Sequence, residues 1–373
     1  MSKRVFINGF NSVTGGGRSI LNSVIGLIGT QQTNWKYCVL VRDAAEYRKH
    51  ASKDIVIVDL PKICRVRAFY PFVNRFVIPR MIKSFNANSV LNFADIATPV
   101  NVHQVFYFDW PYAIYTDPFI WNQLDFPGWI SRKIKLHYVK KYKSYVNEYV
   151  VQTRTVQNRL REKLGIFNTH IVPNAVSFDE GSHNPNSLKL IKDKSEKYFY
   201  LLCLAYYYPH KNIEILVELC QKIKELELPF RIVITISPNQ HKNARQILKN
   251  IERRNVGDIL LNVGPLDAIG VRSIYSEVDA VILPTILETF SGSYVEAMHY
   301  GKPIYTSDMD FAKDVCGDAA EYFDPNSIDS ILRAISKSLS DPDVNTRLIA
   351  AGKKQLEKYG SWENSISQIW KLL

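Results

Sequence analysis

Short apolar runs alternate with longer stretches in which apolar residues recur at helical spacing. In the first such stretch Ile20, Leu21, Val24 and Ile28 form one face of a helix. The runs are short and continuously apolar, which is typical of strands buried on both faces. In the first half these expected strands are Arg4–Asn8, Lys36–Val41, Ile55–Val58, Val90–Asn92, Gln104–Phe108, Tyr149–Gln152 and His170–Val172. The alternation predicts a parallel sheet covered by helices.

The same alternation resumes in the second half. Its expected strands are Phe199–Ala205, Arg231–Ile236, Ile259–Asn262, Ala280–Leu283 and Pro303–Thr306. Helices are expected from about Ile213, over Ile269–Glu277 and from Gly292. After Asp308 the pattern predicts helices only, the last an amphipathic helix from Trp362 to Trp370. The predicted fold class is therefore α/β, with two Rossmann-like, doubly wound domains.

A polar stretch rich in Gly, Pro and Asn separates the two halves, from Pro173 to Ser187. We expect a first domain over 1–176, a linker over 177–190, a second domain over 191–358, and a C-terminal helix over 359–373. A length of 373 residues agrees with two domains of ordinary size.

Composition narrows the class of protein. Hydrophobic residues make up 46% and charged residues 22% of the chain, as in a globular protein. Apolar runs are too short to span a membrane, and the chain enters a strand directly after Met1, so we expect no secretory signal. The five cysteines are scattered and form no CxxC pair, which indicates a reducing cytosol and no zinc site.

The chain is basic, with 47 Lys and Arg against 36 Asp and Glu, a net charge of +11. Such a balance favours a polyanionic partner: nucleic acid, acidic lipid or a phosphorylated substrate. Segments 62–83 and 129–145 mix Lys and Arg with aromatic residues, as helices that rest on anionic membranes do. A solvated basic face over a core stripe of Ile134, Val139 and Tyr142 is the alternative. No nucleic-acid motif is visible, so we expect no nucleic-acid partner.

Two carboxylates, Glu288 and Glu296, flank an expected strand-to-helix turn. Amides from about Phe290 to Ser293 would lie at the helix N-terminus, where an anion is favoured. A carboxylate on each side can accept hydrogen bonds from hydroxyl groups. Together they predict a pocket for a phosphate with a sugar at either end, that is, a nucleotide sugar. A strand–helix unit with a solvated Glu fits the spacing equally well.

Three other positions are candidates because they follow expected strands. Gly15–Gly17 open the first helix and let the backbone approach a ligand, although they do not form the GxGxxG dinucleotide fingerprint. Lys211 lies just before a helix, where it can meet a phosphate, and Asn212 is the expected cap of that helix. Asp109 ends a strand before a Trp-Pro turn. The plainer alternatives are a flexible turn, an exposed loop lysine and a turn aspartate.

These motifs together resemble the family 4 retaining glycosyltransferases of the GT-B fold. The stretch from Pro284 to Pro303 looks like the family's E-x7-E signature, and Pro209–Asn212 looks like its P-x-K-[GN] loop. Val172–Ala175 resembles its I-P-N-G segment, and Gly15–Gly17 fits its glycine loop. The resemblance implies that an acceptor-side first domain and a nucleotide-sugar-binding second domain face a cleft, with the C-terminal helix crossing back to the first domain.

The resemblance also implies roles. Glu288 would contact the donor sugar, Glu296 the ribose, and the turn around Gly264 the base. The diphosphate would be held by Lys211 and the amides of Phe290, Ser291 and Gly292, with Gly16 and Gly17 closing on it. Two positions depart from the family: Tyr206 replaces an Arg, and Asp109 replaces a His that contacts the donor sugar in many members. Glu288 and Asp109 are the catalytic candidates.

The expected function is a retaining, metal-independent glycosyltransferase in surface polysaccharide (O-antigen or capsule type) or glycoconjugate biosynthesis. It would use a nucleotide-sugar donor, a glycan or polyprenyl-diphosphate-linked acceptor, and no cofactor or metal. The DxD-like spellings at Asp308–Asp310 and Asp341–Asp343 are attributed to chance. A sugar-nucleotide epimerase or phosphorylase is the main alternative, and a nucleic-acid binder a further one. The expected location is the cytoplasm, at the inner face of the membrane.

Overall fold

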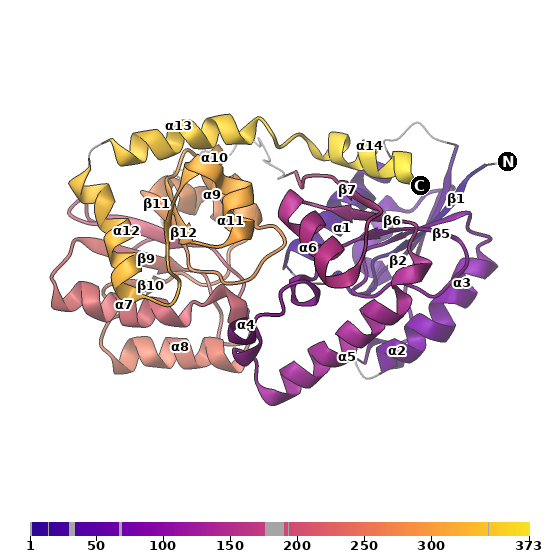
Figure 1. The fold of residues 1–373 in the computed structure, drawn as a ribbon, viewed down its shortest axis with the longest axis horizontal. Coiled ribbons are helices and arrows are strands. Elements are labelled where there is room, and N and C mark those ends of the chain that lie inside the picture. Colours follow the sequence, from indigo (N-terminus) through magenta and orange to yellow (C-terminus); the bar gives the residue numbers. More distant parts are fainter. Residues whose placement is uncertain are drawn as a thin grey trace. The chain divides into compact units, whose positions relative to one another are not determined.

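The computed structural model describes residues 2–13, 15–29, 34–66, 69–175, 190–192, 194–341 and 343–373. The chain divides into two compact units (Figure 1). Unit 1 comprises Met1–Asp117, Asp125–Ala175 and Gly360–Leu373, and unit 2 comprises Pro118–Leu124 and Val176–Tyr359. The linker expected over 177–190 lies outside the described residues except for Leu190.

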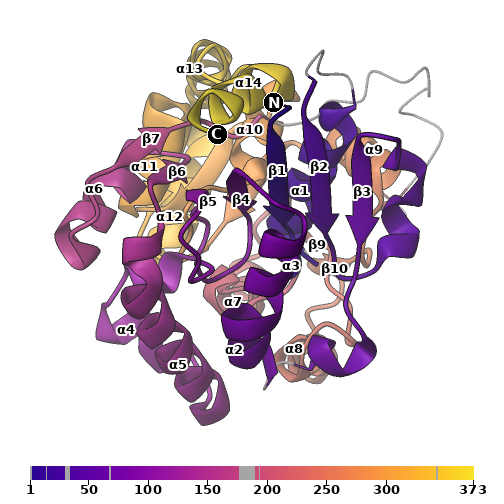
Figure 2. The same ribbon diagram turned by 90° about the vertical axis from the view of Figure 1, so that its right-hand side faces the viewer.

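Unit 1 is built on a seven-stranded parallel sheet of order β3-β2-β1-β4-β5-β6-β7 (Figure 2). The strands are β1 (Arg4–Asn8), β2 (Lys36–Leu40), β3 (Ile55–Val58), β4 (Ser89–Asn92), β5 (His103–Tyr107), β6 (Glu148–Val151) and β7 (Thr169–Ile171). Helices cover both faces, so the central strands have no solvated side. This explains why β1 is a continuous apolar run: Val5, Phe6 and Ile7 are all fully buried.

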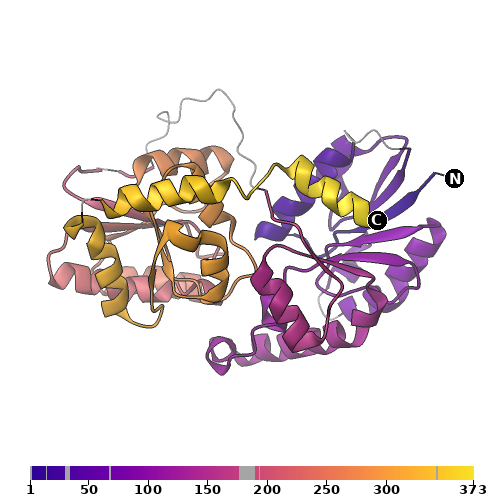
Figure 3. The same ribbon diagram turned by 45° about the horizontal axis from the view of Figure 1, so that its top comes forward.

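The helices of unit 1 are α1 (Gly15–Ile28), α2 (Tyr70–Phe72), α3 (Ile78–Ser84), α5 (Phe126–Tyr142), α6 (Arg154–Leu164) and α14 (Trp362–Leu372). A π-helical turn, η4 (Val73–Val77), joins α2 to α3. The last helix, α14, packs beside α1 (Figure 3). Its apolar side enters the core of unit 1, and Trp370 Nε1 donates a hydrogen bond to the Tyr37 hydroxyl at 3.0 Å.

Unit 2 is built on a six-stranded parallel sheet of order β10-β9-β8-β11-β12-β13. Its strands are β8 (Phe199–Cys203), β9 (Phe230–Ile234), β10 (Leu260–Asn262), β11 (Ala280–Leu283), β12 (Ile304–Ser307) and β13 (Ala320–Phe323). Its helices are α4 (Pro118–Asn122), α7 (Glu214–Glu225), α8 (Lys242–Arg253), α9 (Ala268–Glu277), α10 (Gly292–His299), α11 (Asp310–Cys316), α12 (Ile328–Ser340) and α13 (Val344–Leu356). The predicted class, two doubly wound α/β sheets, is confirmed.

Two local predictions are wrong. Strand β13 lies where helices alone were expected, because Ala-Glu-Tyr-Phe at a sheet edge carries little apolar signal and leaves Glu321 and Tyr322 half-buried. Asn212 does not cap α7. Its backbone is left-handed, at φ 54°, and its side-chain amide donates to the Pro325 carbonyl at 2.9 Å, while Ile213 is the N-cap residue.

The strand order fixes where each sheet reverses its direction of winding. The reversal lies between β1 and β4 in unit 1 and between β8 and β11 in unit 2. Ligands of open α/β sheets bind outside the carboxyl ends of the strands at such a point. The loops that follow these four strands are therefore the first places to look for function.

Candidate functional site

In unit 2 the loops after β8 and β11 meet at the point of reversal. Lys211, from the turn Pro209–Lys211, forms an ion pair with Glu288 through Nζ and Oε1. Their side chains are only 15% and 12% exposed, so the pair is largely shielded from water. The two residues are 77 positions apart, and the pairing of β8 with β11 brings them together.

Backbone hydrogen bonds hold the two loops in register. The amide of Ile286 donates to the His210 carbonyl at 2.9 Å, and the Thr285 hydroxyl donates to the same carbonyl at 3.1 Å. Thr285 also lies 3.4 Å from Glu288 Oε1, as a donor to that carboxylate. The Lys211–Glu288 pair is thus a fixed feature of the loops rather than a chance surface contact.

The start of α10 lies in the same group of loops. Ser291 is its N-cap residue but makes no side-chain capping bond within the described residues. A Cβ at Gly292 would meet no atom of the described chain within 4 Å outside its neighbours and its own helix, so the space beside this residue is open. The Ser293 hydroxyl donates to the Leu204 carbonyl at 3.3 Å, which ties the helix start to the end of β8. This end of α10 is suited to an anion.

Glu296 lies one turn further along α10 and is half-buried. The Tyr275 hydroxyl donates to Glu296 Oε2 at 3.4 Å, and the Tyr275 ring stacks on Tyr300. Burial raises the pKa of Glu296, against the smaller opposing effects of the Tyr275 hydrogen bond and the Lys211 charge. Sequence reasoning missed Tyr275, whose only signal was its place on the apolar face of an expected helix.

The turn after β10 reaches the same edge of the sheet. Gly264 has φ +78°, a conformation that favours glycine, and a Cβ there would meet no atom of the described chain within 4 Å. Its amide donates to Asn262 Oδ1 at 3.3 Å, which holds the turn to the strand end. The turn therefore presents an open backbone surface, as expected for a part that contacts a flat ligand group.

In unit 1 the glycines form the first turn of α1. A Cβ at Gly16 would meet nothing in the described chain within 4 Å, whereas a Cβ at Gly17 would lie 3.5 Å from Asp109 Oδ2. The Asp109 carboxyl thus lies next to the helix start, and the glycine leaves room for it. Burial raises the pKa of Asp109 to about 7, helped by the negative charge of Asp95 and opposed by Lys135.

Asp95 and Lys135 complete this group, and sequence reasoning missed both. Lys135 Nζ lies 2.5 Å from Asp95 Oδ1 and 4.3 Å from the centre of the Trp110 ring. Burial lowers the pKa of Lys135, and Asp95 is the main opposing influence. A signal was present: Lys135 precedes the buried Val139 and Tyr142 by four and seven residues, so it lies on the inward stripe of α5.

Tyr206, at the position where many members of the resembled family carry an Arg, belongs to a row of rings. Its ring centre lies 5.2 Å from that of Tyr208, which in turn stacks on His210 at 5.4 Å. Tyr206 is 40% exposed, so this row ends in solvent beside the Lys211 turn. Aromatic faces thus replace a cation at this position.

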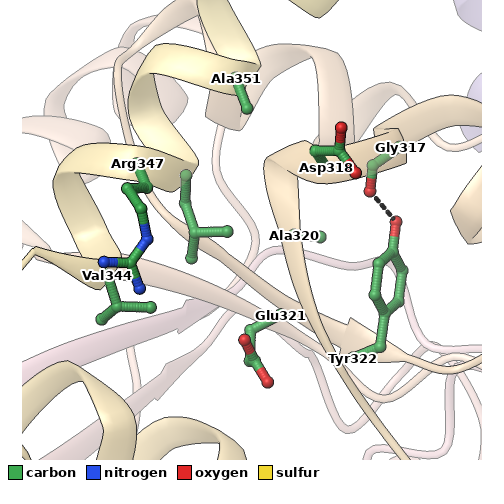
Figure 4. A pocket seen from close by; sticks show the side chains of 9 residues that line it. Gly317, Asp318, Ala320, Glu321, Tyr322, Val344, Arg347 and Ala351 are labelled. Carbon is green, nitrogen blue, oxygen red and sulfur yellow. Dashed lines mark hydrogen bonds between the residues drawn. The ribbon is translucent and has the colours of Figure 1, made fainter. Parts of the chain in front are cut away.

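A hollow that is open to solvent lies in unit 2 between α13 and β13 (Figure 4). It has a volume of about 420 Å³ and is lined by Gly317, Asp318, Ala320, Glu321, Tyr322, Val344, Arg347, Leu348 and Ala351. The Tyr322 hydroxyl donates to the Gly317 carbonyl at 2.7 Å, and Arg347 pairs with Asp341 at 2.6 Å. It contains none of the predicted site residues.

Two searches of the described residues were negative. No group of three or more His, Cys, Asp or Glu side chains there is placed to hold a metal ion. Within the same residues, no helix has both the length and the apolar character needed to cross a membrane.

Comparison with known proteins finds a family match in the second half of the chain. Residues 187–355 match the family model described as glycosyl transferases group 1. O-antigen chain mannosyltransferase B of Escherichia coli is 27% identical over 169 residues, which are 45% of this chain and 44% of the relative. The match therefore spans less than half of the length of that curated relative.

Solved structures are similar over the whole chain. Sucrose-phosphate synthase of Thermosynechococcus elongatus has a TM-score of 0.74 at 16% identity, covering 100% of this chain and 98% of its own. HepE of Anabaena, in complex with UDP and glucose, has a TM-score of 0.72 at 11% identity, covering 100% and 99%. At these identities the likeness shows the fold, which is GT-B. Residues 187–355 are thus similar to glycosyl transferases group 1, and the whole chain has the GT-B fold, which agrees with the prediction of a glycosyltransferase.

Proposed function

We propose that this protein is a retaining, metal-independent glycosyltransferase of family 4, which transfers a sugar from a nucleotide-sugar donor to a glycan or polyprenyl-diphosphate-linked acceptor. The observation that carries the proposal is the shielded Lys211–Glu288 pair beside the uncapped start of α10. It joins a cation and a helix N-terminus, which suit a diphosphate, to a carboxylate, which suits sugar hydroxyls.

The chemistry requires stabilisation of a departing diphosphate while positive charge develops at the sugar. Lys211 and the amides at the start of α10 supply positive electrostatic potential for the leaving group. In this proposal Lys211 exchanges its bond to Glu288 for one to phosphate, which leaves Glu288 to accept sugar hydroxyls. Glu288 positions the sugar, since a single carboxylate does not make the paired arrangement of glycosidases. Glu296, which is half-buried, accepts hydrogen bonds from the ribose hydroxyls.

The biological setting is proposed from the relatives. The E. coli protein matched by residues of this chain is named for O-antigen mannosyl transfer, and the Anabaena structure contains UDP. A nucleotide-sugar donor and a surface-polysaccharide acceptor, of O-antigen or capsule type, extend those names to this chain. We place the reaction on the cytoplasmic side of the membrane, where nucleotide sugars are made.

The test separates donor binding from turnover. Stabilisation by UDP-, GDP- and dTDP-sugars is measured by thermal shift, and turnover by release of nucleotide in the presence of acceptor glycans. Glu296→Ala should weaken nucleotide binding at least 10-fold, whereas Glu288→Ala should keep nucleotide binding and lose turnover at least 100-fold. Glu218→Ala, on the exposed side of α7, is the control. Normal turnover in both site variants would refute the proposal. Product formed without any acceptor would instead indicate an epimerase, and product formed with phosphate a phosphorylase.

We also propose that unit 1 rests on an anionic membrane through segments 62–83 and 129–145. Helix α2 of the first segment lies at the end of unit 1 near the carboxyl ends of its strands (Figure 2). Phe72 and Phe76 are 56% and 44% exposed on the first segment, and Trp129 and Ile134 are 40% and 50% exposed on the second. Exposed lysines and arginines flank them, including Arg75. Exposed apolar groups within a basic surface fit lipid headgroups.

Flotation with vesicles tests this surface. The protein should float with vesicles containing anionic lipid, less so as salt rises, and not with neutral vesicles. Replacing Phe72 and Trp129 by Ser, or Arg75 and Lys133 by Gln, should each reduce flotation several-fold. The charge-matched control is Lys353→Gln with Lys354→Gln, two exposed lysines of α13 in unit 2. Equal flotation of all variants would exclude this surface.

A further inference from the structure

A buried tyrosine of unit 2 holds one oxygen of the Glu296 carboxylate and leaves the other open. Tyr275, on α9, is 0% exposed, and its hydroxyl donates to Glu296 Oε2 at 3.4 Å. Oε1 of the same carboxylate accepts no hydrogen bond from the residues that the structure describes. Glu296 is half-buried rather than enclosed, so a ligand can reach this open oxygen.

Ring stacking holds the Tyr275 hydroxyl in place. The Tyr275 ring lies against the Tyr300 ring, with the ring centres 4.6 Å apart and the planes at 19° to one another. Tyr300 follows Glu296 by four residues, a spacing that places two side chains on the same side of a helix. The C-terminal part of α10 therefore presents a ring and a carboxylate to the same tyrosine. Packed rings favour a defined relative orientation, so this contact keeps the hydroxyl directed at Glu296.

The Tyr275 hydroxyl also supports the charge of the carboxylate. Burial and the negative charge of Glu296 raise the pKa of Tyr275 well above its usual value, so the hydroxyl stays protonated and acts as a donor. Burial raises the pKa of Glu296, whereas the Tyr275 hydrogen bond and the charge of Lys211 lower it. The influence of Lys211 also shows that Glu296 belongs to the same site as the cation expected to meet a phosphate.

We propose that Tyr275 is a positioning residue that makes Glu296 select ribose over 2′-deoxyribose, so that the donors of this protein are ribonucleotide sugars. This rests on the proposed function, in which Glu296 accepts hydrogen bonds from the ribose hydroxyls. With Oε2 held by Tyr275, the open Oε1 faces the ligand in a fixed direction and accepts from the 2′-hydroxyl. A 2′-deoxyribose leaves this desolvated acceptor unpaired, which costs affinity. UDP- and GDP-sugars are therefore expected as donors in preference to dTDP-sugars.

Nucleotide affinity measures this selectivity directly. Binding of UDP, GDP and their 2′-deoxy counterparts to the full chain is measured by titration calorimetry. The unmodified chain should bind at least one of the two ribonucleotides about 10-fold or more tightly than its deoxy counterpart, as expected for a hydrogen bond to a charged group. Tyr275→Phe keeps the ring but removes the hydroxyl. It should reduce the preference to about 3-fold or less, mainly by weakening the binding of the ribonucleotide.

Two comparisons separate positioning from a general effect on stability. Tyr305→Phe is the matched control, because it removes a buried hydroxyl of the same unit that donates to Asn345 Oδ1 at 2.8 Å. It should leave the preference for ribose unchanged. Glu296→Ala should lose most of the preference, and the addition of Tyr275→Phe to it should cause no further loss, since the two residues act through one contact. Thermal unfolding confirms that each variant folds.

The inference and the proposed function fail in different ways. An undiminished preference in Tyr275→Phe, an equal loss in Tyr305→Phe, or a further loss in the double variant would overturn the role of Tyr275. Equal binding of ribonucleotides and deoxyribonucleotides by the unmodified chain would also overturn it, while the proposed sugar transfer would stand. If the unmodified chain binds neither UDP nor GDP and transfers no sugar, the proposed function fails and the inference fails with it.

Discussion

At the residue scale, Asp109 carries a cost in stability that depends on pH. Its pKa is raised from 3.8 to about 7 in the folded chain, mainly by burial. The folded state therefore binds its proton more tightly than the unfolded state does. The contribution of Asp109 to the free energy of unfolding is fully present below its pKa in the unfolded chain, near 4. It is lost as pH rises through its folded pKa of about 7. At neutral and alkaline pH the ionised Asp109 lowers the free energy of unfolding of unit 1.

Asp109→Asn should therefore stabilise unit 1 at pH 8 more than at pH 5. The expected difference between the two pH values is about 1–2 kcal/mol, after allowance for solvent at this partly exposed group. Urea unfolding followed by tryptophan fluorescence is the measurement, since five of the six tryptophans lie in unit 1: Trp35, Trp110, Trp129, Trp362 and Trp370. Asp59→Asn is the control. An equal effect at both pH values would contradict the raised pKa.

Residues that sequence reasoning identified and residues that it missed differ in a physical way. Lys211 and Glu288 both follow apolar strands, and loops after neighbouring parallel strands meet, so their proximity could be expected from the pattern. The spacing of Lys135 from Val139 and Tyr142 indicates that it faces inward, but its partner Asp95 lies in a distant loop and is recognisable only by the pairing in space. A long-range ion pair leaves no trace in local periodicity.

At the scale of elements, strands of continuous apolar residues were predicted within one or two residues, and elements defined by polar contacts were not. The turn η4 is an example. A π-helical turn contains one residue more per turn than an α-helix, and here it directs Asn74 inward. Asn74 Nδ2 donates to the Ala97 carbonyl at 2.9 Å, and its Oδ1 accepts from the Thr98 hydroxyl at 3.1 Å. The sequence predicted only a basic, aromatic helix over 62–83.

Asn74 should matter for stability out of proportion to its size. It is 1% exposed and ties the basic segment to the loop that carries Asp95. Asn74→Ala would leave a buried carbonyl and a buried hydroxyl without this partner, at an expected cost of about 2–3 kcal/mol. Chemical denaturation measures the cost, with the exposed Asn101→Ala as the control. A loss of stability no larger than that of the control would mean that a water molecule takes over the hydrogen bonds of the Asn74 amide.

At the scale of the whole molecule, the chain order and the division into units do not coincide. Helix α14 follows unit 2 in the sequence but completes the core of unit 1, where Ile366 and Ile369 are fully buried. The Ser89 hydroxyl donates to the Leu373 carbonyl at 2.7 Å, so even the last residue is fixed. The amphipathic pattern of α14 was visible in the sequence. The surface against which α14 packs was not, because it forms only once the sheet of unit 1 has folded.

Removal of residues 360–373 should therefore unfold unit 1 selectively. Each apolar side chain lost from the core contributes about 1.5–3 kcal/mol. The contributions of Trp362, Ile366, Ile369 and Trp370 together are therefore comparable with the whole stability of an ordinary domain, about 5–15 kcal/mol. Calorimetry should show the loss of one transition, while unit 2 keeps its own transition and its stabilisation by nucleotide. Trp370→Phe mainly removes the hydrogen bond to Tyr37 and serves as a less disruptive variant. It should lower the transition temperature of unit 1 without abolishing its transition. Loss of both transitions on truncation would show that the two units fold as one, and that α14 supports unit 2 as much as unit 1.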